Sequence, residues 1–409
     1  MGGNRALWFL WAGEFASRIG ESFFQITLLW YLVESLSSNL EVGLITMIGY
    51  LPALVVGVWA GVFVDRLDYR HVMLGANLLR AMAVVSIPLL YALGYLPPLL
   101  VAALAFLVTS CSAFFNPARD AVIPLLARGG QLLRANSLVQ SAWQFSLLIG
   151  PFLAALALPF MPTVYLFLPV GLAFLGSWAV LLALRGGERD ATAAAPGAEA
   201  GERPLARLLR EMREGFGYLR EERRVFWIWV ITAVNNFFLM GPVIVGMPIY
   251  VKEHLGASGS AFALIEGAYA GGMILSTWLI VRYGGRWNPT RMLFVGLIYD
   301  GLTFVPMLWL SSVTGTAILI VIHSLGIPTI TISRLTALHG MVRPEVRGRV
   351  FSYFHLAVSG MTALSIGTVG VVLNWIAINE LFAVIGVLCA ACGVWGLALP
   401  HFRGAAPSR

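Results

Sequence analysis

The chain has 409 residues, of which 59% are hydrophobic and only 11% are charged, with a net charge of +7. A soluble globular protein carries about 25% charged residues, so an aqueous environment is excluded for most of this chain. Apolar runs long enough to cross a bilayer use nearly its whole length, which leaves no room for a soluble domain.

Twelve apolar runs are predicted to cross the membrane as α-helices, each needing about 20 residues. The predicted helices span residues 7–32, 42–64, 72–93, 97–115, 138–158, 163–184, 225–250, 261–281, 291–310, 317–338, 350–375 and 381–399. The fourth is expected to end at Asn116-Pro117, ahead of a basic loop. Charges interrupt the first run, whereas a cleavable signal peptide has an uninterrupted apolar core, so we expect no cleavage.

The connection after the sixth helix has a different composition. Residues 186–201 are rich in Ala, Gly and charge without periodicity, which is typical of a flexible linker. From Pro204 onward, apolar residues recur at helical spacing opposite an arginine-rich face, which predicts an amphipathic helix on the membrane surface. We therefore predict an all-α integral membrane protein with two six-helix pseudo-repeats. The predicted parts are a first bundle, a cytoplasmic linker and a second bundle, at residues 1–185, 186–223 and 224–409.

The first helix carries a polar face. Glu14, Arg18, Glu21 and Gln25 are spaced four, three and four residues apart, so they share one side of the helix. A charge at the bilayer centre costs about 3 kcal/mol or more, so this face must look into a helix bundle or a water-filled cavity. Two interpretations remain open: a self-neutralising ladder that only docks the helix, or a functional site.

The basic residues predict the orientation in the membrane. All of the 27 lysines and arginines except Arg18, Arg80 and Lys252 fall in the tails or in loops that follow even-numbered helices. The positive-inside rule then places both termini and the central linker in the cytoplasm, with the protein in the inner (plasma) membrane as a multi-pass protein. Because the arginines are spread over every inner loop, they require no nucleic-acid partner.

Several classes of enzyme and metal site are not supported. Cys111, Cys389 and Cys392 all lie in apolar runs and do not form a disulfide framework. The six histidines are scattered, and the single lysine, Lys252, is not part of a phosphate-binding loop. An intramembrane enzyme would need a nucleophile with a nearby base or clustered metal ligands, and a receptor would need a signalling domain or partner. We expect no enzyme activity, no metal and no cofactor.

A short charged hairpin joins the second and third helices. Residues 61–71 read G-V-F-V-D-R-L-D-Y-R-H, a pattern G-x-x-x-D-R-x-x-x-R that resembles the signature loop of the major facilitator superfamily. Gly150-Pro151 on the fifth helix resembles a motif of proton-coupled drug exporters. The segments N-P-A-R, R-A-N-S-L, G-F-G-Y-L-R and R-G-R-V-F-S resemble the branch that contains macrolide and enterobactin exporters.

This resemblance implies the major facilitator fold and a secondary transporter that works by alternating access. It implies export of a small amphipathic organic compound, drug-like or siderophore-like, by proton antiport. A lysophospholipid or other lipid transporter and a nutrient uniporter or importer stay open as alternatives. The expected partners are a small-molecule substrate, protons and the lipid bilayer, and the expected state is a monomer.

The resemblance also implies a gate at the inner side. The residue that matches the family's loop aspartate is Asp65, which in that family pairs with basic residues and with the start of the eleventh helix. A bare loop-capping role for Asp65 is the alternative. The predicted gating residues are Gly61, Asp65, Arg66, Arg70, Gly150, Pro151 and Arg349.

We predict that the first helix couples protons to transport. Glu14 and Glu21 flank Arg18, so two acids compete for one guanidinium and one of them can take a proton while the other stays paired. Glu21 is predicted as the proton carrier, with Gln25 hydrogen-bonding its neutral form, and Glu14 as the partner of Arg18.

Other polar residues in the apolar runs are candidates for a substrate cavity. They are Gln25, Asn116, Gln140, Gln144, Asn235, Asn236, Glu266 and His355. For Arg80 and Asp300, on helices that are peripheral scaffold in the family, a structural role is favoured. The same holds for the isolated His323.

Overall fold

The computed structural model describes residues 5–64, 67–127, 132–184, 216–284, 287–343 and 346–402. Helices dominate these ranges, and none of these residues is in a β-strand. The α-helices are α1 (Arg5–Ser35), α2 (Asn39–Val55), α3 (Gly57–Val64), α4 (Tyr69–Ala92), α5 (Pro98–Leu126), α6 (Leu132–Ala157), α7 (Phe167–Leu182), α9 (Arg223–Gly241), α10 (Met247–Ile249), α11 (Gly259–Tyr283), α12 (Pro289–Phe304), α13 (Val313–Ser324), α14 (Gly326–Met341), α15 (Arg347–Val372) and α16 (Ile378–Ala398).

Ten helices in the described ranges are long and apolar enough to cross a membrane. Two further predicted spans are missing from that set for identifiable reasons. The first is α1, whose centre carries Glu14, Arg18 and Glu21. The second is α2, which has 17 residues, contains Pro52 and continues after Val56 as α3. With these two, the described residues contain the twelve membrane-spanning segments predicted from the sequence.

Side chains at the helix starts explain several of the observed boundaries. The Asp68 carboxylate caps α4 by accepting a hydrogen bond from the backbone N–H of His71 at 2.9 Å. Asn288 caps α12 in the same way, accepting from the N–H of Arg291 at 3.0 Å. Such caps satisfy N–H groups that have no partner inside the helix. The charged loops therefore also set where the membrane helices begin.

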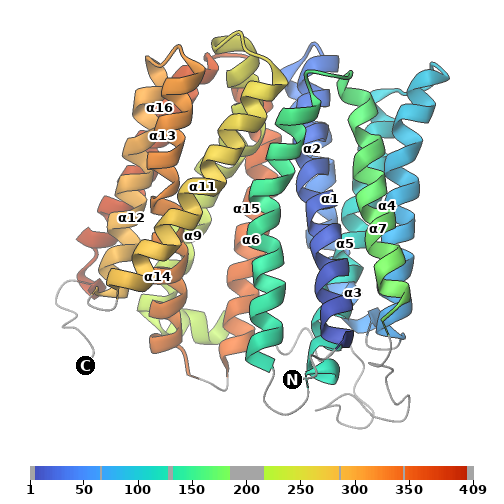
Figure 1. Cartoon of the computed structure of the whole chain (residues 1–409). Coiled ribbons are helices and arrows are strands. Elements are labelled where there is room, and N and C mark those ends of the chain that lie inside the picture. Colours follow the sequence, from blue (N-terminus) through green and yellow to red (C-terminus); the bar gives the residue numbers. More distant parts are fainter. Residues whose placement is uncertain are drawn as a thin grey trace. The chain divides into compact units, whose positions relative to one another are not determined.

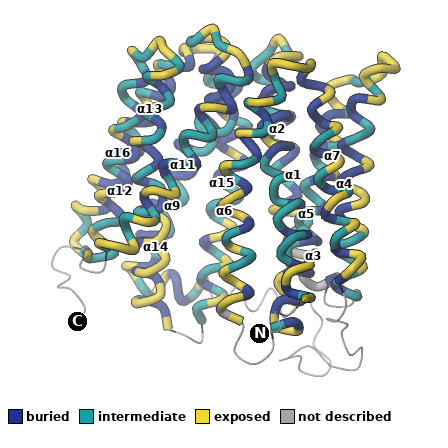
Figure 2. Tube along the Cα trace, in the orientation of Figure 1, coloured by how far each residue is buried: buried dark blue, intermediate teal, exposed yellow. Residues whose placement is uncertain are grey.

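The chain divides into two compact units. Unit 1 comprises Met1–Pro196 with Ser258–Gly267, and unit 2 comprises Gly197–Ala257 with Ala268–Arg409. In unit 1, α1 packs against α6 and α7, and α4 packs against α5 and α7. In unit 2, α12 packs against α14 and α16, and α9 packs against α15. Figure 1 shows the helices of each unit running alongside one another, and Figure 2 shows that each helix has buried and exposed sides.

The fourth predicted helix does not end at Asn116-Pro117, so that boundary was wrong. The structure continues α5 through Pro117 and Pro124 to Leu126. Proline is tolerated inside membrane helices because neighbouring helices and hydroxyl side chains can satisfy the backbone groups that it frees. Asn116 and Arg119 therefore lie within a helix and not in a basic loop.

Most of the predicted cytoplasmic linker, including its flexible part and most of the amphipathic helix, lies outside the described residues. The described part starts at Phe216. Tyr218 and Leu219 are buried in the apolar cluster of unit 2 together with Phe294 and Val350. The Tyr218 hydroxyl donates a hydrogen bond to the carbonyl oxygen of Met341 at 3.2 Å. The end of the linker is thus anchored on unit 2.

Small residues bring α12 and α16 into close contact. A Cβ atom added to Gly301 would collide with the backbone oxygen of Gly386 and the backbone nitrogen of Ala390. Backbone contacts cannot move aside as a flexible side chain can. In a bilayer, where lipid tails are as apolar as leucine, this close packing is a main source of helix association.

We expect Gly301→Ala to destabilise unit 2 by about 1–3 kcal/mol, the usual range for overpacking. Thermal unfolding of the purified protein in detergent measures the effect. Gly271→Ala on α11 is the matched control, because a Cβ at Gly271 would meet nothing within 4 Å. Equal melting temperatures for the two variants would contradict this account of the α12–α16 contact.

Candidate functional site: a buried charge network around α1

The polar face of α1 forms a continuous ion-pair ladder. The Nε atom of Arg18 lies 2.7 Å from Glu14 Oε1, and its Nη1 atom lies 2.7 Å from Glu21 Oε2. One guanidinium thus bridges both carboxylates, as the spacing of four and three residues predicts. The side chain of Arg18 is 16% exposed, so most of this charge is removed from solvent.

Helix α5 adds a second arginine and two polar groups to the ladder. Arg119 Nη1 lies 2.5 Å from Glu14 Oε1, so Glu14 Oε1 accepts from two guanidiniums. The Asn116 side-chain oxygen accepts from Arg18 Nη2 at 2.7 Å and from Arg119 Nη1 at 3.2 Å. The Ser112 hydroxyl donates to Glu21 Oε1 at 2.8 Å. The contacts of Arg119 require α5 to continue past Pro117.

Helix α4 contributes a third arginine, Arg80, which is fully buried. Its Nη1 atom lies 3.1 Å from Glu21 Oε1 and donates to the Ser17 hydroxyl at 3.0 Å. Its guanidinium stands over the rings of Phe115 and Phe174, at 4.8 Å and 5.4 Å from their centroids. Cation–π contacts of this kind strengthen when water is excluded. A structural role was favoured for Arg80 from the sequence. In the structure, Arg80 also contacts Glu21, the predicted proton carrier, directly.

The charges in this cluster do not balance. Arg18, Arg80 and Arg119 carry three positive charges, and Glu14 and Glu21 carry two negative charges when ionised. Arg119 also pairs with Asp120, but that carboxylate is 63% exposed and is screened by solvent. The arginines thus outnumber the acids by one, so each carboxylate has at least two guanidinium partners in this conformation. A carboxylate of the ladder can therefore take a proton only when its arginines are released or charge arrives from elsewhere.

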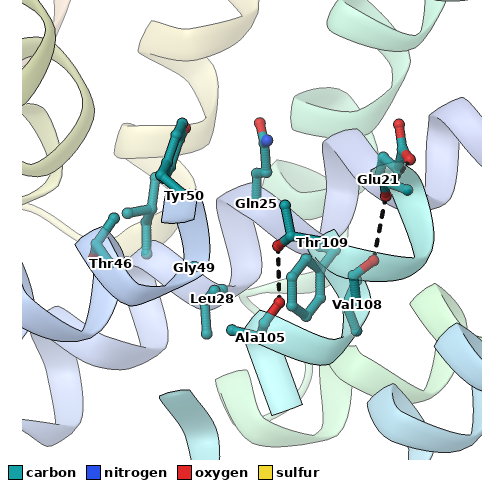
Figure 3. A pocket seen from close by; sticks show the side chains of 12 residues that line it. Glu21, Gln25, Leu28, Thr46, Gly49, Tyr50, Ala105, Val108 and Thr109 are labelled. Carbon is teal, nitrogen blue, oxygen red and sulfur yellow. Dashed lines mark hydrogen bonds between the residues drawn. The ribbon is translucent and has the colours of Figure 1, made fainter. Parts of the chain in front are cut away.

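The two acids of α1 differ in their access to the surroundings. Glu14 is fully buried, whereas the Glu21 side chain is 19% exposed. Glu21 lines a pocket, here called the α1 pocket, that is walled by both polar and apolar side chains of unit 1. Its lining residues are Glu21, Phe24, Gln25, Leu28, Leu29, Thr46, Gly49, Tyr50, Ala105, Val108, Thr109 and Ser112. Figure 3 shows Glu21, Gln25 and Tyr50 projecting to the same side of this pocket.

The remaining cavity candidates occupy several helices of the two units. Gln140 and Gln144 lie on α6, and Glu266 lies on α11. His355 lies on α15 and is exposed. In unit 2, Asn235 and Asn236 are buried on α9. The Asn236 amide donates to the carbonyl oxygen of Val358 and to the Thr362 hydroxyl, both at 3.2 Å, so its side chain joins α9 to α15.

The predicted gating residues can be placed only in part. Asp65 and Arg66 lie outside the described residues, whereas Gly61 is in α3 and Arg349 is in the first turn of α15. Arg70 donates to the carbonyl oxygens of Leu181 and Leu182 at the end of α7. Arg70 therefore ties α4 to α7 within unit 1.

The predicted Gly150-Pro151 motif lies where α6 meets α1. A Cβ atom on Gly150 would lie 2.6 Å from Ser22 Cβ and 3.0 Å from the backbone nitrogen of Phe23. Both Gly150 and Pro151 are buried. The glycine thus permits close approach of α6 to the helix that carries the charge ladder.

Together, the many membrane-spanning helices of the described ranges and a buried charge network beside a mixed polar and apolar pocket define a multi-pass membrane transporter. The chain belongs to the Major Facilitator Superfamily, whose family model matches residues 10–366. Members of this family are transporters and not enzymes.

Comparison with known proteins agrees with this membership. The chain is 26% identical to macrolide efflux protein A of Streptococcus pyogenes over 386 residues, which cover 93% of this chain and 92% of that protein. A segment of 128 residues is 33% identical to the multidrug efflux pump Tap of Mycolicibacterium fortuitum, covering 30% and 31% of the two chains. A solved POT family transporter in complex with a thioalcohol-conjugated peptide has a TM-score of 0.75 at 13% identity, over 98% of this chain and 97% of that one.

Proposed function

We propose that this protein is a secondary exporter that moves a small amphipathic organic compound out of the cell in exchange for protons. The observation that carries the proposal is the position of Glu21, an arginine-paired carboxylate that forms part of the wall of the α1 pocket. The apolar lining suits an amphipathic substrate, and the polar groups suit its hydrogen-bonding part. Similarity to proteins named for macrolide and multidrug efflux supports export as the direction.

The contacts of the ladder supply a coupling mechanism. In the described conformation Glu21 binds Arg18, Arg80 and Ser112, while Glu14 binds Arg18 and Arg119. A proton on Glu21 removes the charge that holds Arg18 Nη1 and Arg80 Nη1. Hydrogen bonds to charged groups are worth about 1.5–3 kcal/mol each, so their loss can shift the balance between two conformations of the unit.

The roles of the two acids follow from their exposure. Glu21 can exchange a proton or meet a substrate through the α1 pocket, whereas sealed Glu14 keeps Arg18 in place when Glu21 becomes neutral. The driving force is sufficient, since one charge crossing a potential of 100 mV yields about 2.3 kcal/mol. A cationic substrate that approaches the ladder would displace the proton and complete the exchange.

The gate at the inner side is also part of the proposal. As the family resemblance implies, Asp65 would pair with nearby basic residues and with the start of the eleventh helix, and Arg66, Arg70 and Arg349 would take part in the gate. The hydrogen bonds from Arg70 to the end of α7 hold the first turn of α4, which follows this loop, against α7. Movement at Gly150-Pro151 would change the packing of α6 on α1, and with it the position of the ladder.

Substrate flux into liposomes that contain only this protein tests the function. With a radiolabelled macrolide as the probe and a more acidic lumen, we expect uptake that a protonophore abolishes and a matching loss of protons from the lumen. A rate of macrolide uptake that does not depend on the proton gradient would rule out antiport. Failure to move the macrolide, with movement of a lysophospholipid instead, would support the lipid-transporter alternative.

The proposed orientation predicts which loops an impermeant thiol reagent can reach. A cysteine at Lys252, between α10 and α11, is expected to react from outside intact cells, and one at Ala193, in the cytoplasmic linker, is expected not to react. The native Cys111, Cys389 and Cys392 are buried and give a low background. The reverse labelling would overturn the orientation.

A further inference from the structure

Unit 2 contains a buried pair of titratable side chains that the charge ladder does not involve. Asp300 on α12 is fully buried, and His323 on α13 is 2% exposed. The Nε2 atom of His323 lies 3.5 Å from Asp300 Oδ1. On the other side of the ring, Nδ1 lies 2.9 Å from the Thr303 hydroxyl oxygen.

The hydrogen bonds of Thr303 determine which imidazole nitrogen carries hydrogen. The Thr303 hydroxyl donates its only hydrogen to the backbone carbonyl oxygen of Asp300 at 2.7 Å, because a carbonyl oxygen can only accept. The hydroxyl oxygen must then accept from His323 Nδ1–H. In a neutral ring with this tautomer, Nε2 has a lone pair and no hydrogen.

That lone pair would then lie 3.5 Å from the Asp300 carboxylate, which is unfavourable unless a proton lies between the two groups. Either Nε2 is protonated and the pair is an imidazolium with a carboxylate, or the carboxyl group is protonated and donates to Nε2. Both arrangements contain one proton more than the fully deprotonated pair. The arrangement of Thr303, His323 and Asp300 therefore favours a bound proton at this place.

The described residues around Asp300 do little to compensate a charge on its carboxylate. Among the described residues, neither oxygen of its carboxylate has a hydrogen-bond partner. The titratable groups that face the pair are a thiol and two phenols, none of which can carry a positive charge: Cys389 from α16, Tyr269 from α11, with its ring 6.4 Å from that of His323, and Tyr299 from α12. The Phe304 ring covers the imidazole at 4.2 Å. Loss of the proton would leave an ionised carboxylate in an apolar site, which is strongly unfavourable.

A break between two helices lies next to this pair. His323 lies at the end of α13, which is interrupted at Leu325 before α14 begins. Gly326, the first residue of α14, lies against the Tyr299 ring. A bend at this interruption would change the distance between His323 and Asp300, because the two residues are on different helices.

We propose that Asp300 and His323 form a second proton-binding site, which holds one proton between carboxylate and imidazole and releases it to water when α12 and α13 separate. No covalent bond is made or broken other than the O–H or N–H bond of that proton. The binding of the proton is independent of the proposed function. The release of this proton during transport rests on the proposed proton antiport. If Glu21 carries one proton and the Asp300–His323 pair carries a second, two protons are exchanged for each substrate molecule.

Infrared difference spectroscopy of the purified protein tests the binding step without transport. Between acid and alkaline pH, we expect the wild type to show a carboxyl or imidazolium band that disappears in Asp300→Asn and shifts in His323→Gln. Glu41→Gln, the same change at an exposed acid on α2, is the matched control and should leave that band unchanged. A folded Asp300→Asn variant with the wild-type spectrum and the wild-type number of titrating protons would overturn the site.

Flux measurements test the release step. In liposomes, Asp300→Asn is expected to keep substrate counterflow while the number of protons moved per substrate falls by one. An unchanged stoichiometry in this variant would mean that the pair holds a permanent proton and would overturn the release. Should the wild type move substrate with no protons at all, the proposed antiport fails, and the infrared result still decides whether the pair binds a proton.

Discussion

Replacing Glu21 by Gln is expected to abolish proton-driven uphill efflux while substrate binding and downhill exchange continue. The substituted amide keeps the size of the side chain and can still accept from Ser112, but it cannot bind or release a proton. It also weakens the hold on Arg18 Nη1 and Arg80 Nη1, which lie 2.7 Å and 3.1 Å from the Glu21 carboxylate. Because the amide of Glu21→Gln is always neutral, this variant should mimic the transporter with a proton on Glu21.

The measurement is substrate flux with and without a pH gradient, in the same liposomes as for the wild type. We expect at least a tenfold loss of gradient-driven flux and a counterflow rate close to that of the wild type. The matched control combines Glu21→Gln with Gln25→Glu, which adds an acid one turn along α1. This double variant should not regain the pH dependence that Glu21→Gln loses.

One pattern of results would assign proton coupling to a residue other than Glu21. If Glu21→Gln pumps uphill with a normal pH dependence, while Asp300→Asn or Glu266→Gln does not, the proton is carried by another acid and the ladder on α1 is structural. Loss of coupling in both Glu21→Gln and Asp300→Asn would fit two proton sites, one in each unit.

The ladder on α1 was predictable from the sequence because helical geometry determines it. Residues four and three positions apart on one helix must lie on one face, so Glu14, Arg18 and Glu21 were expected to meet before any tertiary contact was known. The division into apolar helices was predictable for a similar reason, since a run of about 20 apolar residues has few alternatives in a chain with so few charges.

The partners from other helices were not predictable in this way. Arg119 was assigned to a loop because Asn116-Pro117 resembles a helix end, yet membrane packing lets α5 continue past the proline. Arg80 reaches Glu21 through a long-range contact between α4 and α1, which no local spacing encodes. The sequence showed only that Arg80 is an arginine within an apolar run, and this does not indicate which residue it pairs with.

The pair formed by Asp300 and His323 also depends on helix register. The two residues are on separate helices, and close contacts set how those helices meet. Gly301 touches the backbone of α16, and Gly326 touches the Tyr299 ring. From the sequence alone each side chain was an isolated polar residue for which a structural role was favoured. Only the register brings Nε2 to within 3.5 Å of the carboxylate.

Replacing Glu14 by Gln is expected to have a different effect from the change at Glu21: a loss of stability. Glu14 is fully buried, and its Oε1 atom accepts from Arg18 at 2.7 Å and from Arg119 at 2.5 Å. Without the charge of Glu14, Glu21 would be the one acid of the ladder on α1 left to balance Arg18, Arg80 and Arg119. Removing one partner of a buried ion pair costs about 3–5 kcal/mol, and we expect about 3 kcal/mol because Asn116 and Asp120 still bind Arg119.

Thermal unfolding in detergent, followed by tryptophan fluorescence, measures this loss, and Arg119→Met provides the decisive comparison. In the double variant Glu14→Gln with Arg119→Met, one buried charge of each sign is removed, so the surplus of one positive charge returns to its original value. We therefore expect the double variant to melt at a higher temperature than Glu14→Gln alone. If the double variant is the less stable of the two, the arginine contributes by packing and not by its charge, and the electrostatic account of the ladder is wrong.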